Sequence, residues 1–388
     1  MTVTSAKGFR ASGITAGIKA SGKPDLALVV NDGPLDVAAG VFTGNRFKAA
    51  PVLWSQQAVA DGQLRAVVLN SGGANACTGP DGFADTHLTA EHVAAALGGV
   101  GFDTGAGDVG VCSTGLIGER LPMPLILAGI EEGARTLSDA GGADAAVAIM
   151  TTDSVPKVAS VTIDGFTVGG MAKGAGMLAP ALATMLVVLT TDAVITRDEA
   201  DDALRRATGL TFDRIDSDGC MSTNDTVLLL ASGASGITPL AAAFVDAVTD
   251  VCADLARQLI ADAEGASKEI VITVAGAAVA DDALSVARAI SRSNLLKCAI
   301  HGEDPNWGRV LSAIGTTDAA FEPDAVDVAI NGVWVCRGGA IGDSRDGVDM
   351  SARVVRIDVD LKAGGEEATL WTNDLTADYV HENSAYAT

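Results

Sequence analysis

Apolar and polar positions along the chain switch between two periods. Glu269–Ala275 is a run of strand-forming residues, and positions 326–330 and 354–361 alternate with period two, as half-buried strands do. Ala241–Ala263 has apolar residues at helical spacing, and Asp281–Lys297 reads as a helix with acids at its start and a lysine at its end. The alternation predicts an α/β or α+β protein whose C-terminal part, from about residue 270, is a small β-rich subdomain.

Composition and charge narrow the classes of partner. The chain has 388 residues, of which 48% are apolar, enough for a large core in two or more subdomains. Its net charge of −23 opposes nucleic acid and anionic membranes. No apolar run approaches the roughly 18–20 residues of a membrane-spanning helix, and the first residues lack the pattern of a secretion signal. We therefore expect a cytoplasmic protein that binds neither nucleic acid nor membrane.

Metal and nucleotide cofactors lack sequence support. The six cysteines lie far apart without CxxC pairs, and the four histidines lack the HExxH spacing of zinc enzymes. The glycine-rich segments at 72–79 and 169–176 fit neither the dinucleotide fingerprint nor a P-loop. We expect no metal and no bound cofactor.

The most informative segment is Lys173–Asp192, in which a glycine-punctuated loop meets a short apolar run that begins after Thr184. A threonine at such a junction can attack the carbonyl of Ala183, accept the acyl group on its hydroxyl and be freed by hydrolysis as a new N-terminal residue. Its α-amine, with an ordinary pKa of about 7.7–8.0, can then act as the base for its own hydroxyl. By spacing alone, the same residues also fit an ordinary loop-to-strand transition.

This segment resembles the self-cleavage signature of the ornithine acetyltransferase family, also called the glutamate N-acetyltransferase family. Other stretches resemble blocks of the same family and extend to the last residue: Phe42–Phe47, Asn70–Gly79, Cys112–Gly118, Thr151–Asp153, Asp216–Asp225, Gly302–Arg309 and Glu382–Thr388. The resemblance implies a layered α/β sandwich of the kind shared with self-cleaving aminopeptidases. It also implies acetyl transfer from N-acetylornithine to glutamate in arginine biosynthesis.

The resemblance assigns roles to particular residues. Thr184, at the Ala183–Thr184 cleavage point, is the expected nucleophile, and Thr114 and Gly115 are the expected donors to the oxyanion. The expected substrate contacts are Thr151, Thr152, Lys173, Glu264, Asn383 and Thr388. Read without the family, Thr114–Gly115 is a turn after a strand, Lys173 is a solvated loop lysine, and the terminal block is a frayed tail.

Cleavage would divide the chain into an α fragment, residues 1–183, and a β fragment, residues 184–388, which we expect to stay interleaved in one fold. The resemblance implies that two such pairs form an α2β2 assembly. Acetyl-CoA remains open as a second acetyl donor. Two alternatives remain: an aminopeptidase or amidase on the related fold, in which water resolves the acyl-enzyme, and a non-catalytic acidic binding protein.

Overall fold

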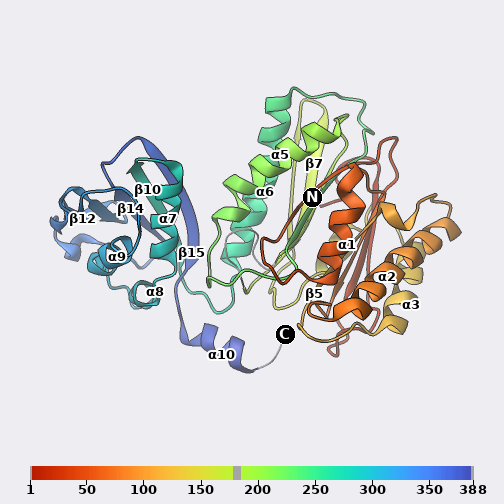
Figure 1. Cartoon of the computed structure of the whole chain (residues 1–388), viewed down its shortest axis with the longest axis horizontal. Helices are drawn as coiled ribbons and strands as arrows, with labels where there is room; N and C mark the ends of the chain where they lie inside the picture. Colours follow the sequence, from red (N-terminus) through yellow and green to blue (C-terminus); the bar gives the residue numbers. More distant parts are fainter. Residues whose placement is uncertain (1, 178–184, 386–388) are drawn as a thin grey trace. The chain divides into compact units, whose positions relative to one another are not determined.

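The chain folds into two compact units. The computed structural model describes residues 2–177 and 185–385 (Figure 1). The first unit comprises the residues up to Asp213 together with Cys220–Asp262. The second comprises Arg214–Gly219 and the described residues from Ala263 onward. Ala183, Thr184 and Thr388 lie outside the described residues.

Two sheets form the centre of the first unit. The four-stranded sheet has the order β1–β2–β4–β5, and the five-stranded sheet has the order β3–β9–β8–β7–β6. Strands β4 and β5 are parallel, as are β8 and β9, and the other neighbours are antiparallel. The strands are β1 (Phe9–Ile14), β2 (Leu26–Asn31), β3 (Val37–Phe42), β4 (Ala66–Ser71), β5 (Val109–Thr114), β6 (Lys157–Ile163), β7 (Phe166–Lys173), β8 (Leu186–Thr191) and β9 (Thr226–Ala231).

Helices cover the outer faces of these sheets. α2 (Gly79–Gly99) and α3 (Met123–Arg135) pack on the four-stranded sheet, while α5 (Arg197–Leu210) and α6 (Ala241–Ala261) pack on the five-stranded one. α1 (Ala50–Ala58) lies against β5, and α4 (Gly142–Ala148) lies against β1 and β2. The first unit is therefore a layered sandwich in which two sheets lie between helices, as expected (Figure 1).

Strand β2 shows why its sequence reads as a continuous apolar run. Leu26, Leu28 and Val30 pack with α2 and α3, whereas Ala27 and Val29 pack in the core that also holds residues of β7, β8 and β9. Successive side chains point to opposite faces, and both faces are covered, so every position is apolar until Asn31.

The second unit is built on one six-stranded sheet with the order β13–β12–β11–β14–β10–β15. Its strands are β10 (Glu269–Ala277), β11 (Asp327–Ile330), β12 (Val333–Arg337), β13 (Ala340–Ile341), β14 (Val354–Asp360) and β15 (Glu366–Asn373). Its helices are α7 (Ala280–Ser291), α8 (Asn294–His301), α9 (Trp307–Ile314) and α10 (Ala377–Ala385). Alternation predicted β14 well, because its odd positions from Val355 are buried and the residues between them are not.

The helix predicted over Asp281–Lys297 is wrong in one respect, because two helices occupy that region. α7 ends at Ser291, and α8 begins at Asn294. The side chain of Ser293 accepts a hydrogen bond from the Leu296 amide at 3.3 Å, which is the N-cap of a new helix. Apolar spacing continues across this break, so periodicity alone did not reveal it.

Candidate active site

Register brings several strand ends of the first unit to one edge of the five-stranded sheet. Lys173, the last residue of β7, pairs with Leu186, the first residue of β8. Leu186 in turn pairs with Thr226, the first residue of β9. Met185 and Asp225 therefore lie just beyond this edge, next to each other. The residue that precedes Met185 in the sequence is the expected nucleophile, Thr184.

Thr114 and Gly115 lie at the end of β5 in the other sheet. The amides of Gly72 and Gly73 donate to the Thr114 carbonyl at 2.9 and 3.0 Å. Gly115 has φ +131°, and a Cβ at this position would lie 2.6 Å from the Gly73 nitrogen. Only glycine fits this backbone geometry and this close approach.

Lys173 joins the two sheets at this place. Its side chain is 2% exposed, and its Nζ donates to the Thr114 hydroxyl at 3.1 Å. A buried ammonium group requires polar partners, so this is not the solvated loop lysine of the alternative reading. The structure thus brings together Thr114, Gly115 and Lys173 from sequence positions about 60 residues apart.

Asp153 organises the loop that carries Thr151 and Thr152. Its Oδ2 accepts from the Thr151 amide at 2.9 Å, and its Oδ1 accepts from the Gly174 amide at 2.7 Å. Burial would raise the pKa of Asp153, but the ammonium groups of Lys173 and Lys157 and the Gly174 amide hold it below its usual value. The carboxylate therefore links the threonine loop to the residue after Lys173.

Lys157 forms an ion pair with the carboxylate of Asp153. Its side chain is fully buried, and its Nζ lies 2.6 Å from both Asp153 Oδ1 and Asp262 Oδ2. Asp262 also accepts from the backbone amide and the hydroxyl of Ser154. This network, which is buried at Lys157 and Asp153, holds the segment 151–157 to Asp262.

Two asparagines hold the loops around Thr114. Asn70 Oδ1 accepts from the Ser113 hydroxyl at 2.6 Å, and its Nδ2 donates to the Gly73 carbonyl at 3.1 Å. Asn224 Nδ2 donates to the carbonyls of Ser113 and Ala74 at 2.8 and 2.7 Å. The Asn70–Gly79, Cys112–Gly118 and Asp216–Asp225 blocks contribute to this one scaffold.

A second lysine, which sequence reasoning did not select, lies near Lys173. Lys19 Nζ donates to the carbonyls of Pro24 and Met150 at 2.9 and 2.6 Å. Burial lowers the pKa of Lys19, Asp25 opposes this, and the charge of Lys173 adds to it. No motif marks Lys19, because two of its neighbours, Met150 and Lys173, come from distant parts of the chain.

In the second unit, Glu264 and Asn383 lie together. Asn383, on α10, donates from Nδ2 to Glu264 Oε2 at 2.9 Å and to the Tyr379 carbonyl at 3.0 Å. The loop of Glu264 is held nearby, because the Thr376 hydroxyl donates to the Gly265 carbonyl at 2.6 Å. Residues 377–385 are helical, so the terminal block up to Ala385 is not a frayed tail.

Two other features of the described residues resemble sites. Ser267 Oγ and Asp374 Oδ2 lie 3.1 and 3.0 Å from His301, but both contact the same ring nitrogen, Nδ1. A catalytic serine triad needs the serine and the carboxylate on opposite nitrogens, so this cluster cannot relay a proton between them.

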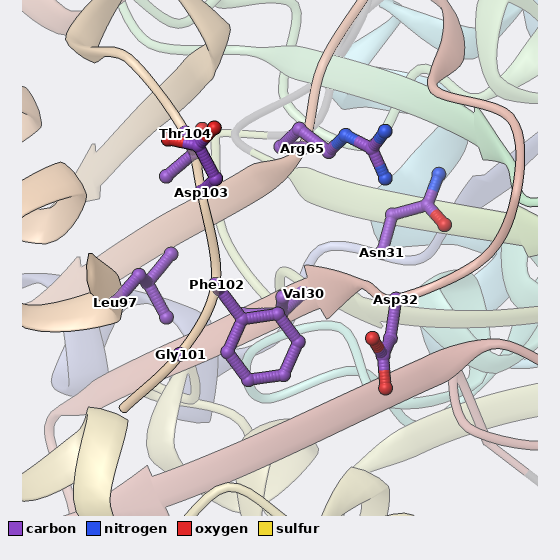
Figure 2. A pocket seen from close by; sticks show the side chains of 9 residues that line it. All are labelled: Val30, Asn31, Asp32, Arg65, Leu97, Gly101, Phe102, Asp103 and Thr104. Atoms are coloured by element: carbon purple, nitrogen blue, oxygen red, sulfur yellow. The ribbon is translucent and has the colours of Figure 1, made fainter. Parts of the chain in front are cut away.

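The second feature is a cavity of about 240 Å³ in the first unit, which Figure 2 shows with Asp32, Arg65 and Phe102 in its wall. Arg65 donates to the Gly33 carbonyl at 3.1 Å, and Asp32 pairs with Arg10 at 2.9 Å. These polar groups therefore already have protein partners. None of the expected site residues lines this cavity.

Within residues 2–177 and 185–385, no cluster of three or more His, Cys, Asp or Glu side chains is placed to hold a metal ion. The same residues contain no helix long and apolar enough to span a membrane.

Comparison with known proteins gives one consistent result. The model of the ArgJ family matches residues 10–388. The "Arginine biosynthesis bifunctional protein ArgJ" of Streptomyces coelicolor is 68% identical over 387 residues and covers the full length of both chains. The protein of the same name from Mycobacterium tuberculosis is 58% identical, over 99% of this chain and 96% of its own. A solved structure of ornithine acetyltransferase complexed with ornithine, from M. tuberculosis, is 62% identical over 48% of this chain and 96% of its own, with a TM-score of 0.46.

Proposed function

Because this chain belongs to the ArgJ family, we propose that it transfers the acetyl group of N-acetylornithine to glutamate in arginine biosynthesis. It is an acyltransferase of the ornithine acetyltransferase type. The observation that carries the chemistry is that Lys173, which pairs with Leu186 at the start of β8, donates to the Thr114 hydroxyl at the end of β5. This places a buried cation and a hydroxyl donor near the residue that follows Thr184.

The first step of the proposed mechanism is processing at Ala183–Thr184. The Thr184 hydroxyl attacks the Ala183 carbonyl, the peptide C–N bond gives way to an ester C–O bond, and the proton passes to the nitrogen. Water then cleaves the ester, which leaves a carboxylate on Ala183 and a free α-amine on Thr184. This amine supplies the base that the threonine hydroxyl otherwise lacks.

Acetyl transfer then proceeds in two halves. The Thr184 hydroxyl attacks the acetyl carbonyl of N-acetylornithine, the C–N bond breaks, and ornithine leaves with the proton. The amine of glutamate attacks the resulting acetyl ester and restores the hydroxyl. In both halves the developing oxyanion is held by the Thr114 hydroxyl and the Gly115 amide.

Lys173 stabilises this arrangement by its contact with the Thr114 hydroxyl at 3.1 Å. We propose that Thr151 and Thr152 contact the substrate from the loop that Asp153 fixes. From the family resemblance we also propose Glu264, Asn383 and Thr388 as substrate contacts. The Asn383–Glu264 hydrogen bond holds the carboxylate in one orientation, where it suits the cationic amine of ornithine.

We propose that fragments 1–183 and 184–388 stay together after cleavage. The cut falls between β7 and β8, which pair over the full length of β8, and β3 pairs with β9 over the full length of both strands. Separation of the fragments would expose fully buried strands. Two such pairs would form an α2β2 assembly of twice 39.0 kDa, in the cytoplasm. Size-exclusion chromatography with light scattering measures this mass directly.

The test begins with intact-mass spectrometry of the wild-type chain and of Thr184→Ala. The proposal predicts two wild-type fragments, one of which begins at Thr184, and a single uncleaved variant. The cleaved protein should then form acetylglutamate from acetylornithine and glutamate. Release of free acetate at the same rate without glutamate would indicate an amidase. A wild-type chain that stays whole would contradict the mechanism.

The same assay tests a second donor of the acetyl group. We propose acetyl-CoA as an alternative source of the acetyl group, since the acetyl-threonine can form from a thioester as well as from an amide. Glutamate-dependent release of free CoA by the cleaved wild type, and none by Thr184→Ala, is the expected result.

A further inference from the structure

Asp225 is a carboxyl group with an unusual environment. Its side chain is fully buried, and its Oδ1 accepts from the Met185 amide at 3.0 Å. Its Oδ2 is also buried, and no donor meets it with hydrogen-bond geometry. Nearly all buried polar atoms in proteins have a hydrogen-bond partner, so an orphaned oxygen on a carboxyl group requires an explanation.

Nearby hydroxyl groups do not supply that partner. The Thr43 hydroxyl donates to the Ser222 carbonyl at 2.6 Å. The Ser222 and Thr43 hydroxyls lie close enough to lower the pKa of Asp225, but neither meets Oδ2 with hydrogen-bond geometry. Burial raises the pKa of Asp225 well above its usual value, and the Met185 amide, the Lys173 ammonium and the Ser222 and Thr43 hydroxyls oppose this only in part. Burial therefore outweighs the groups around this carboxyl, and Oδ2 remains without a hydrogen-bond partner.

The backbone of Met185 is held on both sides by the same segment. Its amide donates to Asp225, and its carbonyl accepts from the Thr226 amide at 3.2 Å. Met185 itself is 1% exposed. The position of this residue is therefore fixed by the beginning of β9, and Asp225 is the side chain that fixes its amide.

The proposed function supplies the missing donor. Processing creates an α-amino group on residue 184, and only the Cα and carbonyl carbon of that residue separate this nitrogen from the Met185 nitrogen. Two nitrogens joined through only two carbon atoms can both approach one carboxyl group. A free α-amine has more than one N–H donor. The peptide amide of residue 184 in the uncleaved chain has only one.

We propose that Asp225 is the positioning residue for the amino group created at position 184. One carboxyl oxygen holds the Met185 amide, and the other accepts a hydrogen bond from the α-amine that processing releases. The inference rests on the proposed function, because without cleavage no such amine exists. It explains why a buried carboxyl oxygen is left without a partner in the continuous chain.

The most direct test is a crystal structure of the cleaved wild-type enzyme. The α-amino nitrogen should lie about 2.7–3.2 Å from Asp225 Oδ2. An α-amino nitrogen beyond hydrogen-bond distance of Asp225 would overturn the proposal. This test needs no variant and does not depend on how substitutions affect folding.

Kinetics of Asp225→Asn provide the second test. Asparagine keeps an acceptor for the Met185 amide but puts an NH2 group in place of Oδ2, so a purely structural role would survive. The proposal predicts that the variant is cleaved, that kcat per cleaved chain falls by about 10²-fold, and that KM changes by less than about threefold, since a misplaced base impairs the chemical step rather than binding.

Asp192→Asn is the matched control. Asp192 is 2% exposed and lies in the same sheet, directly after β8, where its oxygens accept from the amides of Lys7 and Thr167 at 3.1 and 2.7 Å. Both oxygens face donors, so this variant should lose more stability than Asp225→Asn yet keep its kcat.

The outcomes separate the two proposals. A wild type that is cleaved and transfers acetyl, with Asp225→Asn equal to it in kcat, would overturn the role of Asp225 alone. A folded Asp225→Asn chain that does not cleave would do the same, because it would place the carboxyl group in the cleavage step. A wild type that is never cleaved would instead refute the proposed function.

Discussion

The Lys173 ammonium donates to the Thr114 hydroxyl at 3.1 Å, although the two residues come from different sheets. The contact orients the hydroxyl oxygen toward the cation and leaves the hydroxyl proton available to another acceptor. A carbonyl oxygen that gains negative charge during acyl transfer is such an acceptor, and the nearby positive charge favours it further. This pair is the basis of the first two predictions.

Replacement of Thr114 by valine should lower kcat for acetyl transfer by about 10²–10³-fold, because it removes one donor to the oxyanion and keeps the shape of the side chain. Steady-state kinetics on the cleaved protein measure this. Thr114→Ser keeps the hydroxyl and should retain most of the activity. Equal rates for Thr114→Val and the wild type would refute the oxyanion role.

Replacement of Lys173 by methionine should lower kcat/KM by at least about tenfold, because the buried cation next to the oxyanion donor is lost. Activity of the cleaved protein is the readout. Lys23→Met, at an exposed lysine, is the control and should behave as the wild type. If both variants kept wild-type rates, Lys173 would have only a packing role.

Replacement of Gly115 by alanine should destabilise the fold by about 1–3 kcal/mol, because the new Cβ would lie 2.6 Å from the Gly73 nitrogen. Gly118→Ala is the matched control, since Gly118 also has a positive φ, +92°, but no atom lies within 4 Å of its added Cβ. Urea unfolding of the two variants separates the clash from the backbone strain. A similar loss in both would show that the close approach to Gly73 has no effect.

Replacement of Lys157 by methionine should destabilise the protein by about 3–5 kcal/mol, because Asp153 and Asp262 would be left buried without their cation. Arg205→Met removes the exposed pair with Asp201 and should cost at most about 1 kcal/mol. Denaturant unfolding at pH 7 compares them. Losses of equal size would contradict the assignment of a buried network.

Acid should weaken the same network. The pKa of Asp153 is lower in the folded protein than its usual value, so its contribution to stability is complete above the unfolded pKa of about 3.9 and is lost as the pH falls through the folded value. The free energy of unfolding should therefore decline more steeply below about pH 4 in the wild type than in Asp153→Asn. Parallel pH profiles would contradict this sign.

Much of the fold followed from local patterns. The half-buried alternation of β14 and the apolar stripe of α6 were readable because the sheet and helix periods differ and each element has a defined buried face. The break between α7 and α8 was not, because it depends on one serine side chain capping a helix within a continuous apolar pattern.

The residues of the candidate site were likewise predicted only in part from the sequence. The sequence selected Thr114, Gly115 and Lys173 by resemblance, and the structure brings these three together. It named Asp153 and Asp225 only as members of motif blocks, and it did not notice Lys19 at all. Their importance lies in burial and in partners, neither of which is visible along the chain.

By itself, the sequence determined the family, the α/β character and the segment in which processing is expected, because these depend on residue order and on periodicity. Only the tertiary structure decided that Asn224 binds a carbonyl 111 residues away, that Lys173 is buried against Thr114, and that one oxygen of Asp225 has no partner. Hydrogen bonds and desolvation act over a few ångströms in space, so they depend on which distant segments the fold places side by side.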